Sequence, residues 1–156
     1  MSMSERLRYS GWFNGITHVF PVRVYYEDTD ISGIVYHANY LRYFERGRSE
    51  FLRLAGIRHM VMLANAEPIA WTIRKIDIDY GRAARLDDEL EVHTRFTTMS
   101  GARLAAAQVV KRAGDDLVSA KVEAAIITMA GKPRRIPEEV RAKLQPYLAA
   151  EGGPLA

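Results

Sequence analysis

The segment from Tyr25 to Arg48 gathers most of the side chains in this 156-residue chain that could do chemistry. Asp30 and His37 lie between a predicted strand and a predicted helix, and Tyr26 lies at the end of that strand. A carboxylate in such a loop can act as a general base toward water or attack an acyl carbon directly. Free N–H groups at the start of the helix can hold a developing oxyanion. The pattern therefore indicates a hydrolytic site that uses neither a metal nor a cofactor.

Each of these residues also has a structural interpretation. Asp30, like Asp28, could simply cap a turn, which is what loop aspartates usually do. His37 could orient a water or contact a substrate carbonyl, but a single histidine is more often a solvent-facing or structural residue. Tyr26 could place its hydroxyl beside Asp30 or pack in the core. No two histidines have the spacing of a metal site, so we expect none.

Basic residues form a second group of candidates. Lys132, Arg134 and Arg135 follow the last predicted strand closely, and Arg103 opens an earlier one. Arginines bind phosphate oxygens well, so Arg103, Arg134 and Arg135 could hold an anionic tail such as the phosphates of coenzyme A. Charge clusters at strand ends are more often only solvated, and the two interpretations stay open.

Composition excludes several classes of protein. The chain is 48% hydrophobic and 26% charged with a net charge of +3, which is typical of a globular domain. It lacks the dense basic stripe of a nucleic-acid-binding protein, so we expect no nucleic-acid partner. It has no cysteine, which removes disulfides and thiolate chemistry. No stretch approaches the roughly 20 apolar residues of a membrane span, and the N-terminus has no secretory apolar run. We expect a cytoplasmic protein.

The residues around the candidate site predict a strand followed by a helix. Apolar residues alternate from Phe20 to Tyr26, which is strand periodicity and places Tyr26 on the apolar face. From about Asn39 the apolar residues follow one helical stripe, and Gly56 is a typical stop. This helix would have about 17 residues and a length of roughly 25 Å.

The second half of the chain reads as antiparallel sheet. The apolar phase changes within the first of its strands, which predicts a β-bulge near Arg74 and Lys75. Ser100-Gly101 and Gly114-Asp115-Asp116 are turn sequences that separate the next three strands. The predicted class is α+β, with a sheet wrapped around one helix and an edge strand that needs a cover or a partner. We expect a flexible extension over 1–17, a single domain over 18–148 with a closing helix from Pro137, and a flexible tail over 149–156.

The motif over Val22 to Leu52 reads Tyr-x-Glu-Asp-Thr-Asp-x-x-Gly-x-Val-Tyr-His-x-Asn-Tyr and then Glu-Arg-x-Arg, and Ala84-Arg85-Leu86-Asp87-Asp88 follows later. These residues resemble the hotdog-fold acyl-CoA thioesterases of the 4-hydroxybenzoyl-CoA thioesterase family. The resemblance is closest to the branch associated with the Tol-Pal system and covers roughly Ile16 to Tyr147.

The resemblance implies a hotdog fold, in which an antiparallel sheet of five to six strands wraps one long central helix. It implies hydrolysis of an acyl thioester, on coenzyme A or on acyl carrier protein, to free acid and thiol, with coenzyme A as part of the substrate and no other cofactor. Asp30 matches the catalytic aspartate, the backbone N–H at His37 matches the donor to the thioester carbonyl, and Tyr26 matches the accompanying tyrosine. It also implies a homo-oligomer, a dimer paired edge to edge or a tetramer of such dimers, with active sites at subunit interfaces. A non-catalytic acyl-CoA-binding module, or a hydratase or dehydratase on the same fold, remain the alternatives.

Overall fold

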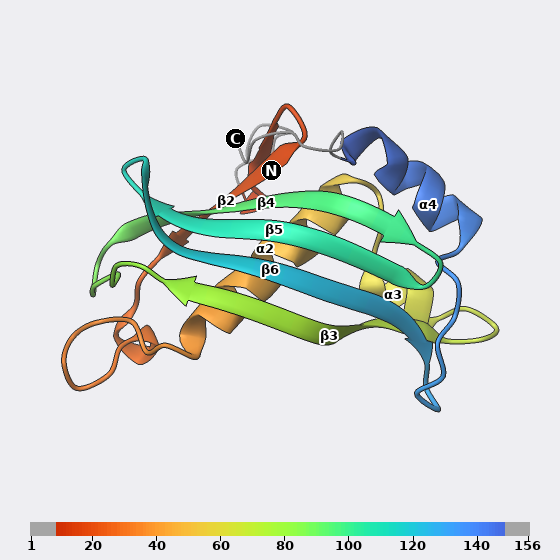
Figure 1. Ribbon diagram of the computed structural model, residues 1–156, viewed down its shortest axis with the longest axis horizontal. Coiled ribbons are helices and arrows are strands. Elements are labelled where there is room, and N and C mark those ends of the chain that lie inside the picture. The colour runs from red at the N-terminus through yellow and green to blue at the C-terminus, as the bar shows by residue number, and fades with distance from the viewer. Residues whose placement is uncertain (1–8, 149–156) are drawn as a thin grey trace.

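The computed structural model describes residues 9–148, and these form one antiparallel sheet with a helix across one face (Figure 1). The six strands lie in the order β1-β2-β4-β5-β6-β3. Their bounds are β1 Trp12–Asn14, β2 Thr17–Arg23, β3 Ile69–Tyr80, β4 Glu89–Ser100, β5 Arg103–Arg112 and β6 Asp115–Thr128. The helices are α2 Asn39–Leu54, α3 His59–Leu63 and α4 Glu138–Leu144, with 3-10 turns η1 Tyr26–Asp28 and η2 Gln145–Tyr147. This arrangement confirms the α+β class and the sheet around a central helix.

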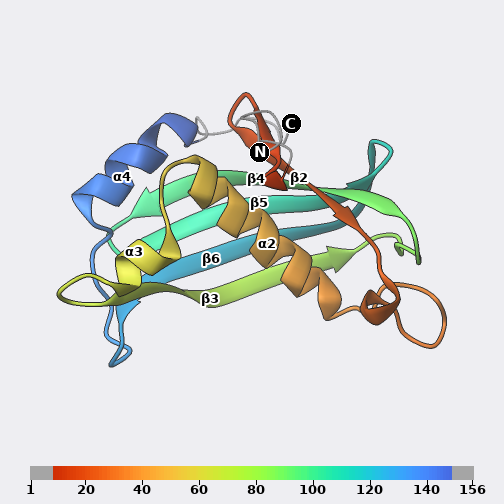
Figure 2. The same ribbon diagram turned by 180° about the vertical axis from the view of Figure 1, so that it is seen from behind.

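Helix α2 lies diagonally across the concave face of the sheet, as Figure 2 shows from behind. Tyr43, Phe44 and Phe51 on the helix are fully buried against the sheet. At Gly47 the helix approaches the sheet closely, because a Cβ there would lie 2.7 Å from a methyl carbon of Val92. The apolar side of α2 is thus buried against the sheet, and this packing fixes the position of the first turn of the helix.

Strand β3 forms one edge of the sheet and contains the predicted bulge. Its pairing with β6 shifts register between Ile73 and Lys75, which confirms the bulge near Arg74 and Lys75. The extra residue keeps Ile73 and Ile76 on the same face of the sheet although they are three residues apart. The other edge of β3 has no strand beside it among the described residues.

The first predicted strand is shorter than expected. β2 ends at Arg23, and Tyr26 begins the η1 turn with its side chain 84% exposed. The prediction that Tyr26 lies on the apolar face is therefore wrong. The chain leaves the sheet because the Asp28 carboxylate accepts a hydrogen bond from the Tyr25 N–H at 2.8 Å, which winds the backbone into a turn.

The ordered sheet also begins before residue 18. β1 pairs with β2, and the buried ring of His18 hydrogen-bonds through Nε2 to the Ser10 carbonyl oxygen at 2.8 Å. The Phe13 ring lies 4.9 Å from that of Phe51 on α2. Residues 9–17, part of the expected extension, are thus packed onto the domain, whereas the expected tail 149–156 lies outside the described residues.

Candidate functional site

The loop that carries Asp30 is a small hairpin held by its own backbone. Thr29 and Val35 form an antiparallel bridge, and the Asp30 N–H donates to the Ile34 carbonyl at 3.0 Å. Gly33 closes the loop by donating to the Asp30 carbonyl at 3.1 Å with a φ of +78°, a conformation that favours glycine. The backbone therefore fixes the position of residue 30 before any side chain contributes.

The Asp30 carboxylate is exposed and accepts two hydrogen bonds from Ser32, one from its hydroxyl and one from its N–H at 2.9 Å. These two bonds, the hydroxyl first, lower the pKa of the Asp30 carboxyl, and the charge of His37 acts in the same direction. Asp30 therefore does stabilise the turn, as its structural interpretation predicts, and this hydrogen bonding has a second effect. It also keeps the carboxylate ionised at neutral pH, as a base or nucleophile requires.

The start of α2 lies beside this loop and has open hydrogen-bond donors. The Tyr80 hydroxyl donates to the His37 carbonyl at 2.9 Å, and the Asn39 N–H donates to the Tyr36 carbonyl at 2.8 Å. No side chain caps the helix at Ala38. Within the described chain, the N–H groups of His37 and Ala38 have no hydrogen-bond acceptor. Such groups at a helix start are suited to a negative oxygen.

A buried carboxylate connects this loop to the helix. Asp28 is only 6% exposed, and its second oxygen accepts from the Asn39 side-chain amide at 3.0 Å. The neighbouring Tyr43 has a raised pKa, first because it is buried and then because of the Asp28 charge. The Tyr43 hydroxyl nevertheless forms no hydrogen bond, either to Asp28 or to Asn39. The sequence pattern suggested only a turn cap for Asp28 and gave no role to Asn39. The polar side chain of Asn39, between Ala38 and Tyr40 at the start of the predicted helix, was the one sign that it could bind a buried carboxylate.

The segment Ala84 to Asp88 holds the loop from the other side. The Val35 N–H donates to the Ala84 carbonyl at 2.9 Å, and the Ala84 N–H donates to the Tyr40 hydroxyl at 3.0 Å. The Leu86 N–H donates to the Gly33 carbonyl at 3.3 Å. The motif that was noted far from Asp30 in sequence is thus the support of the Asp30 loop.

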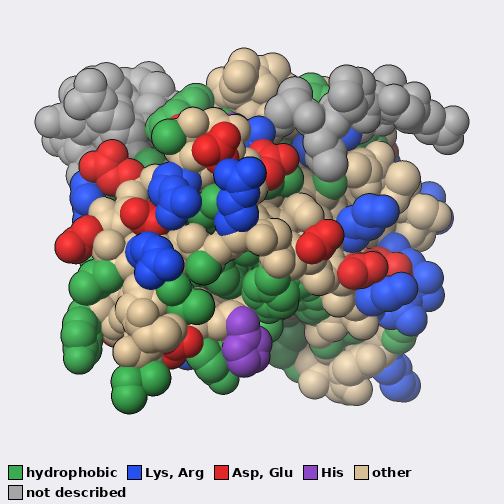
Figure 3. All heavy atoms as spheres, turned by 60° about the vertical axis from the view of Figure 1, so that its left-hand side comes forward, with side chains coloured by type: hydrophobic (Ala, Val, Ile, Leu, Met, Phe, Trp, Pro, Cys, Tyr) green, Lys and Arg blue, Asp and Glu red, His purple; other side chains and the backbone are tan. Residues whose placement is uncertain are grey.

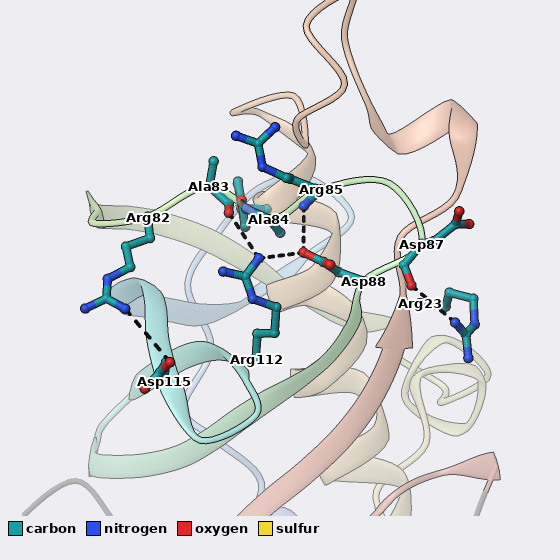
Figure 4. A network of polar contacts seen from close by, with 10 residues as sticks. Arg23, Arg82, Ala83, Ala84, Arg85, Asp87, Asp88, Arg112 and Asp115 are labelled. Carbon is teal, nitrogen blue, oxygen red and sulfur yellow. Dashed lines mark hydrogen bonds and ion pairs between the residues drawn. The ribbon is translucent and has the colours of Figure 1, made fainter.

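Asp88 and Arg112 in turn anchor that segment (Figure 4). The Asp88 carboxylate accepts from Arg112 at 2.6 Å and from the Arg85 N–H at 2.8 Å. Burial would raise the pKa of the Asp88 carboxyl, but these hydrogen bonds and the Arg112 charge hold it below its usual value.

The basic residues that could bind coenzyme A phosphates lie at the end of the sheet opposite to the Asp30 loop. Arg103 pairs with Glu123 at 3.3 Å, and Arg134 pairs with Glu67 at 2.7 Å. The loop with Arg134 and Arg135 follows the end of β6 beside Ile69, whereas His37 contacts Tyr80 at the other end of β3 (Figure 1). β3 has 12 residues, so its ends lie roughly 35 Å apart. One chain therefore does not bring these arginines to Asp30.

Two grooves flank α2, and an exposed apolar patch surrounds the Asp30 loop. A groove of about 470 Å³ lies between α2 and β3, and another of about 610 Å³ lies between β2 and α2. Neither Asp30 nor His37 lines them. Large apolar side chains are instead exposed around the loop, and Figure 3 shows hydrophobic side chains beside a histidine on this side of the molecule. They are Tyr25, Tyr26, Ile31, Tyr36, Tyr80 and Leu86. An exposed apolar patch of this kind marks a binding surface.

The thioesterase-like superfamily model matches residues 24–144. The chain belongs to this superfamily. It is 38% identical over 129 residues to the acyl-CoA thioester hydrolase YbgC of Escherichia coli O6:H1, covering 81% of this chain and 94% of the relative. It is 42% identical over 124 residues to the acyl-CoA thioesterase YbgC of Haemophilus influenzae, covering 79% and 90%. The crystal structure of a probable thioesterase from Bartonella henselae aligns with a TM-score of 0.76 at 44% identity, over 78% of this chain and 99% of that one.

These matches confirm the resemblance read from the motif, and with it the hotdog fold. The YbgC relatives represent the Tol-Pal-associated branch to which the motif is closest. The protein is an enzyme of the thioesterase class.

Proposed function

We propose that the protein hydrolyses acyl-CoA thioesters to the free acid and coenzyme A, the activity in the names of its YbgC relatives. The observation that carries the proposal is local. An ionised carboxylate, Asp30, lies in the same loop as the uncapped start of α2, where the His37 and Ala38 N–H groups are open. A thioester carbonyl needs a nucleophile on its carbon and donors on its oxygen, and these are the two kinds of group present.

The chemistry follows from these groups. The thioester oxygen accepts hydrogen bonds from the helix start, and its negative charge grows as the carbon becomes tetrahedral. Asp30 either takes a proton from the attacking water or attacks the carbon itself to form an anhydride that water then cleaves. In both routes the C–S bond breaks, coenzyme A leaves as thiolate and takes up a proton, and the acyl group leaves as the acid. One oxyanion donor contributes about 3–4 kcal/mol where measured, so placing the carbonyl matters as much as the carboxylate.

A second copy of the chain would complete the site. Asp30 is exposed in one chain, and the free edge of β3 runs along the groove beside α2. We propose that two β3 edges pair antiparallel, because an unpaired edge of 12 residues is a template for another strand. This pairing sets the Tyr80 end of one subunit beside the Ile69 end of the other. The Asp30 loop then faces its partner's groove and basic cluster.

The same pairing gives the basic residues a role. Arg103, Arg134 and Arg135 lie at the Ile69 end, so those of one subunit would approach the Asp30 loop of the other. Arg135 is exposed and forms no ion pair within residues 9–148, which leaves it open for a coenzyme A phosphate. Association of such dimers into tetramers, and a cytoplasmic location, are further parts of the proposal. Among residues 9–148, none of the helices has the length and hydrophobicity that a membrane span requires.

The direct test is thiol release from a panel of acyl thioesters on coenzyme A and on acyl carrier protein, from short aliphatic to long and aromatic. An enoyl-CoA in the panel distinguishes hydrolysis from hydration, and binding without thiol release would indicate a non-catalytic module. Asp30→Asn should keep the fold and lose activity by on the order of 10²–10⁴-fold. His37→Ala should lose less, because its backbone N–H remains. Near-normal turnover by Asp30→Asn would show that another group acts.

A further inference from the structure

The groove between α2 and β3 combines an apolar floor with an unusual cation. It has a volume of about 470 Å³ and is lined on its apolar side by Leu52, Ile73, Phe96 and Leu104. Arg48 projects from α2 to line the same groove, and Trp71 lines it from β3. A cavity of this size and polarity suits a small organic group such as an acyl chain.

A buried glutamine holds Arg48 in place. One Nη of Arg48 donates to the side-chain oxygen of Gln108 at 2.9 Å, and Gln108 is only 1% exposed. The amide nitrogen of Gln108 donates to the Phe44 carbonyl at 2.9 Å and to the Thr94 hydroxyl at 2.8 Å. Both amide protons are thus used, so the glutamine oxygen is fixed toward Arg48. The guanidinium is therefore preorganised by the centre of the sheet.

This guanidinium has no counter-ion within ion-pair distance among the described residues, although the exposed Glu45 lines the same groove. Arg48 forms no ion pair with any residue from 9 to 148, whereas Arg53, five residues further along α2, pairs with Glu50 at 3.3 Å. Burial lowers the pKa of Arg48, and the charge of the exposed Glu45 offsets this only partly. A partly buried cation that is bound only to a neutral amide is costly, and a carboxylate in the groove would remove that cost.

The opposite wall has a donor with no hydrogen-bond partner. The indole N–H of Trp71 is buried and has no hydrogen-bond acceptor in the described structure. Buried donors are nearly always satisfied, so an unsatisfied one needs a partner that is absent here. A cation without an ion-pair partner and an unpaired indole N–H on facing elements, with apolar side chains beside them, fit an apolar chain that carries an oxygen anion.

We propose that this groove holds the acyl part of the substrate and that Arg48 selects acyl chains that end in a carboxylate. Dicarboxylic acyl thioesters are then the preferred substrate class. This inference rests on the proposed function, because the groove faces the Asp30 loop of the partner subunit only in the proposed dimer. A carboxylate of that subunit is the rival occupant. The apolar floor favours the chain, since a charged side chain alone would leave Ile73, which is 42% exposed, uncovered.

The test compares adipoyl-CoA with hexanoyl-CoA, which have equal carbon counts and differ in a terminal carboxylate or methyl. The wild type should show a kcat/KM for adipoyl-CoA about tenfold or more above that for hexanoyl-CoA. Arg48→Met should abolish this preference, because kcat/KM should fall much further for adipoyl-CoA than for hexanoyl-CoA. Arg48→Lys should retain part of it. Arg42→Met, an exposed position on the same helix, should behave as wild type.

Binding separates this inference from the proposed function. Calorimetric titration of Asp30→Asn with both thioesters should show tighter binding of adipoyl-CoA, whether or not the wild type hydrolyses either. Equal selectivity of wild type for the two thioesters would overturn the inference, even if Arg48→Met fails to fold. So would an equal loss on both substrates in Arg48→Met, or its dissociation to monomers in sedimentation velocity, which would assign Arg48 to the subunit interface.

Discussion

Replacing Asp88 by Asn tests whether the Ala84–Asp88 segment positions the catalytic loop. The carboxylate bonds Arg112 at 2.6 Å and the Arg85 N–H at 2.8 Å, with the Asp88 side chain 23% and the Arg112 side chain 36% exposed. A hydrogen bond to a charged group contributes about 1.5–3 kcal/mol, and the exposure of Arg112 reduces this through solvent screening. We therefore expect a loss of about 1–2 kcal/mol in the free energy of unfolding.

The loss should depend on pH in a defined direction. Because the folded state lowers the pKa of the Asp88 carboxyl, its contribution to stability is complete above its unfolded pKa of about 3.9. It is lost as the pH falls through the lower, folded value. The stability difference between wild type and Asp88→Asn should thus be constant near neutral pH and shrink in acid.

The assay is urea unfolding across this pH range together with thioester hydrolysis. Val35 and Gly33 bond directly to the segment that Asp88 anchors, so kcat should fall by about tenfold, because small displacements at a reacting centre are costly. Asp115→Asn is the matched control: its ion pair with Arg82 is 3.9 Å long and mostly exposed, so it should change little. Equal effects of the two substitutions on both stability and kcat would show that the Asp88–Arg112 pair does not position the Asp30 loop.

Three further predictions concern single contacts. Ser32→Ala removes the hydroxyl bond that lowers the pKa of Asp30, so the acid limb of the kcat/KM profile should move to higher pH; an unmoved limb would mean that another group titrates. Gly47→Ala should destabilise the fold by about 1–3 kcal/mol in urea unfolding because its Cβ would meet Val92 at 2.7 Å, although alanine normally favours helices; a stabilised variant would contradict this packing. Tyr80→Phe removes the bond to the His37 carbonyl and should lower kcat several-fold with little change in KM, whereas a change in KM alone would assign Tyr80 to ground-state binding.

Local pattern was enough to predict the sheet and its central helix. The alternation of β3 changes phase between Ile73 and Ile76, and a bulge is the backbone feature that returns both to the inner face. The stripe of α2 likewise follows from the 3.6-residue period alone. These features depend on neighbours in sequence, which is why they could be predicted.

The errors come from contacts between distant residues. Continuing the alternation of β2 predicts Tyr26 on the apolar face, but Asp28 turns the chain, and its buried carboxylate depends on Asn39 eleven positions later. The bond from Arg48 to Gln108 spans 60 positions and has no local signature. The pattern also could not tell at which end of the sheet Arg134 would lie relative to Asp30.

A structure of the Asp30→Asn variant with an uncleaved acyl-CoA tests the central claim most directly. We expect the thioester oxygen within about 3 Å of a backbone N–H at His37 or Ala38, with its carbonyl carbon beside the side chain of residue 30. A thioester bound elsewhere, with its carbonyl beyond the reach of both the helix start and residue 30, would show that neither group takes part in hydrolysis.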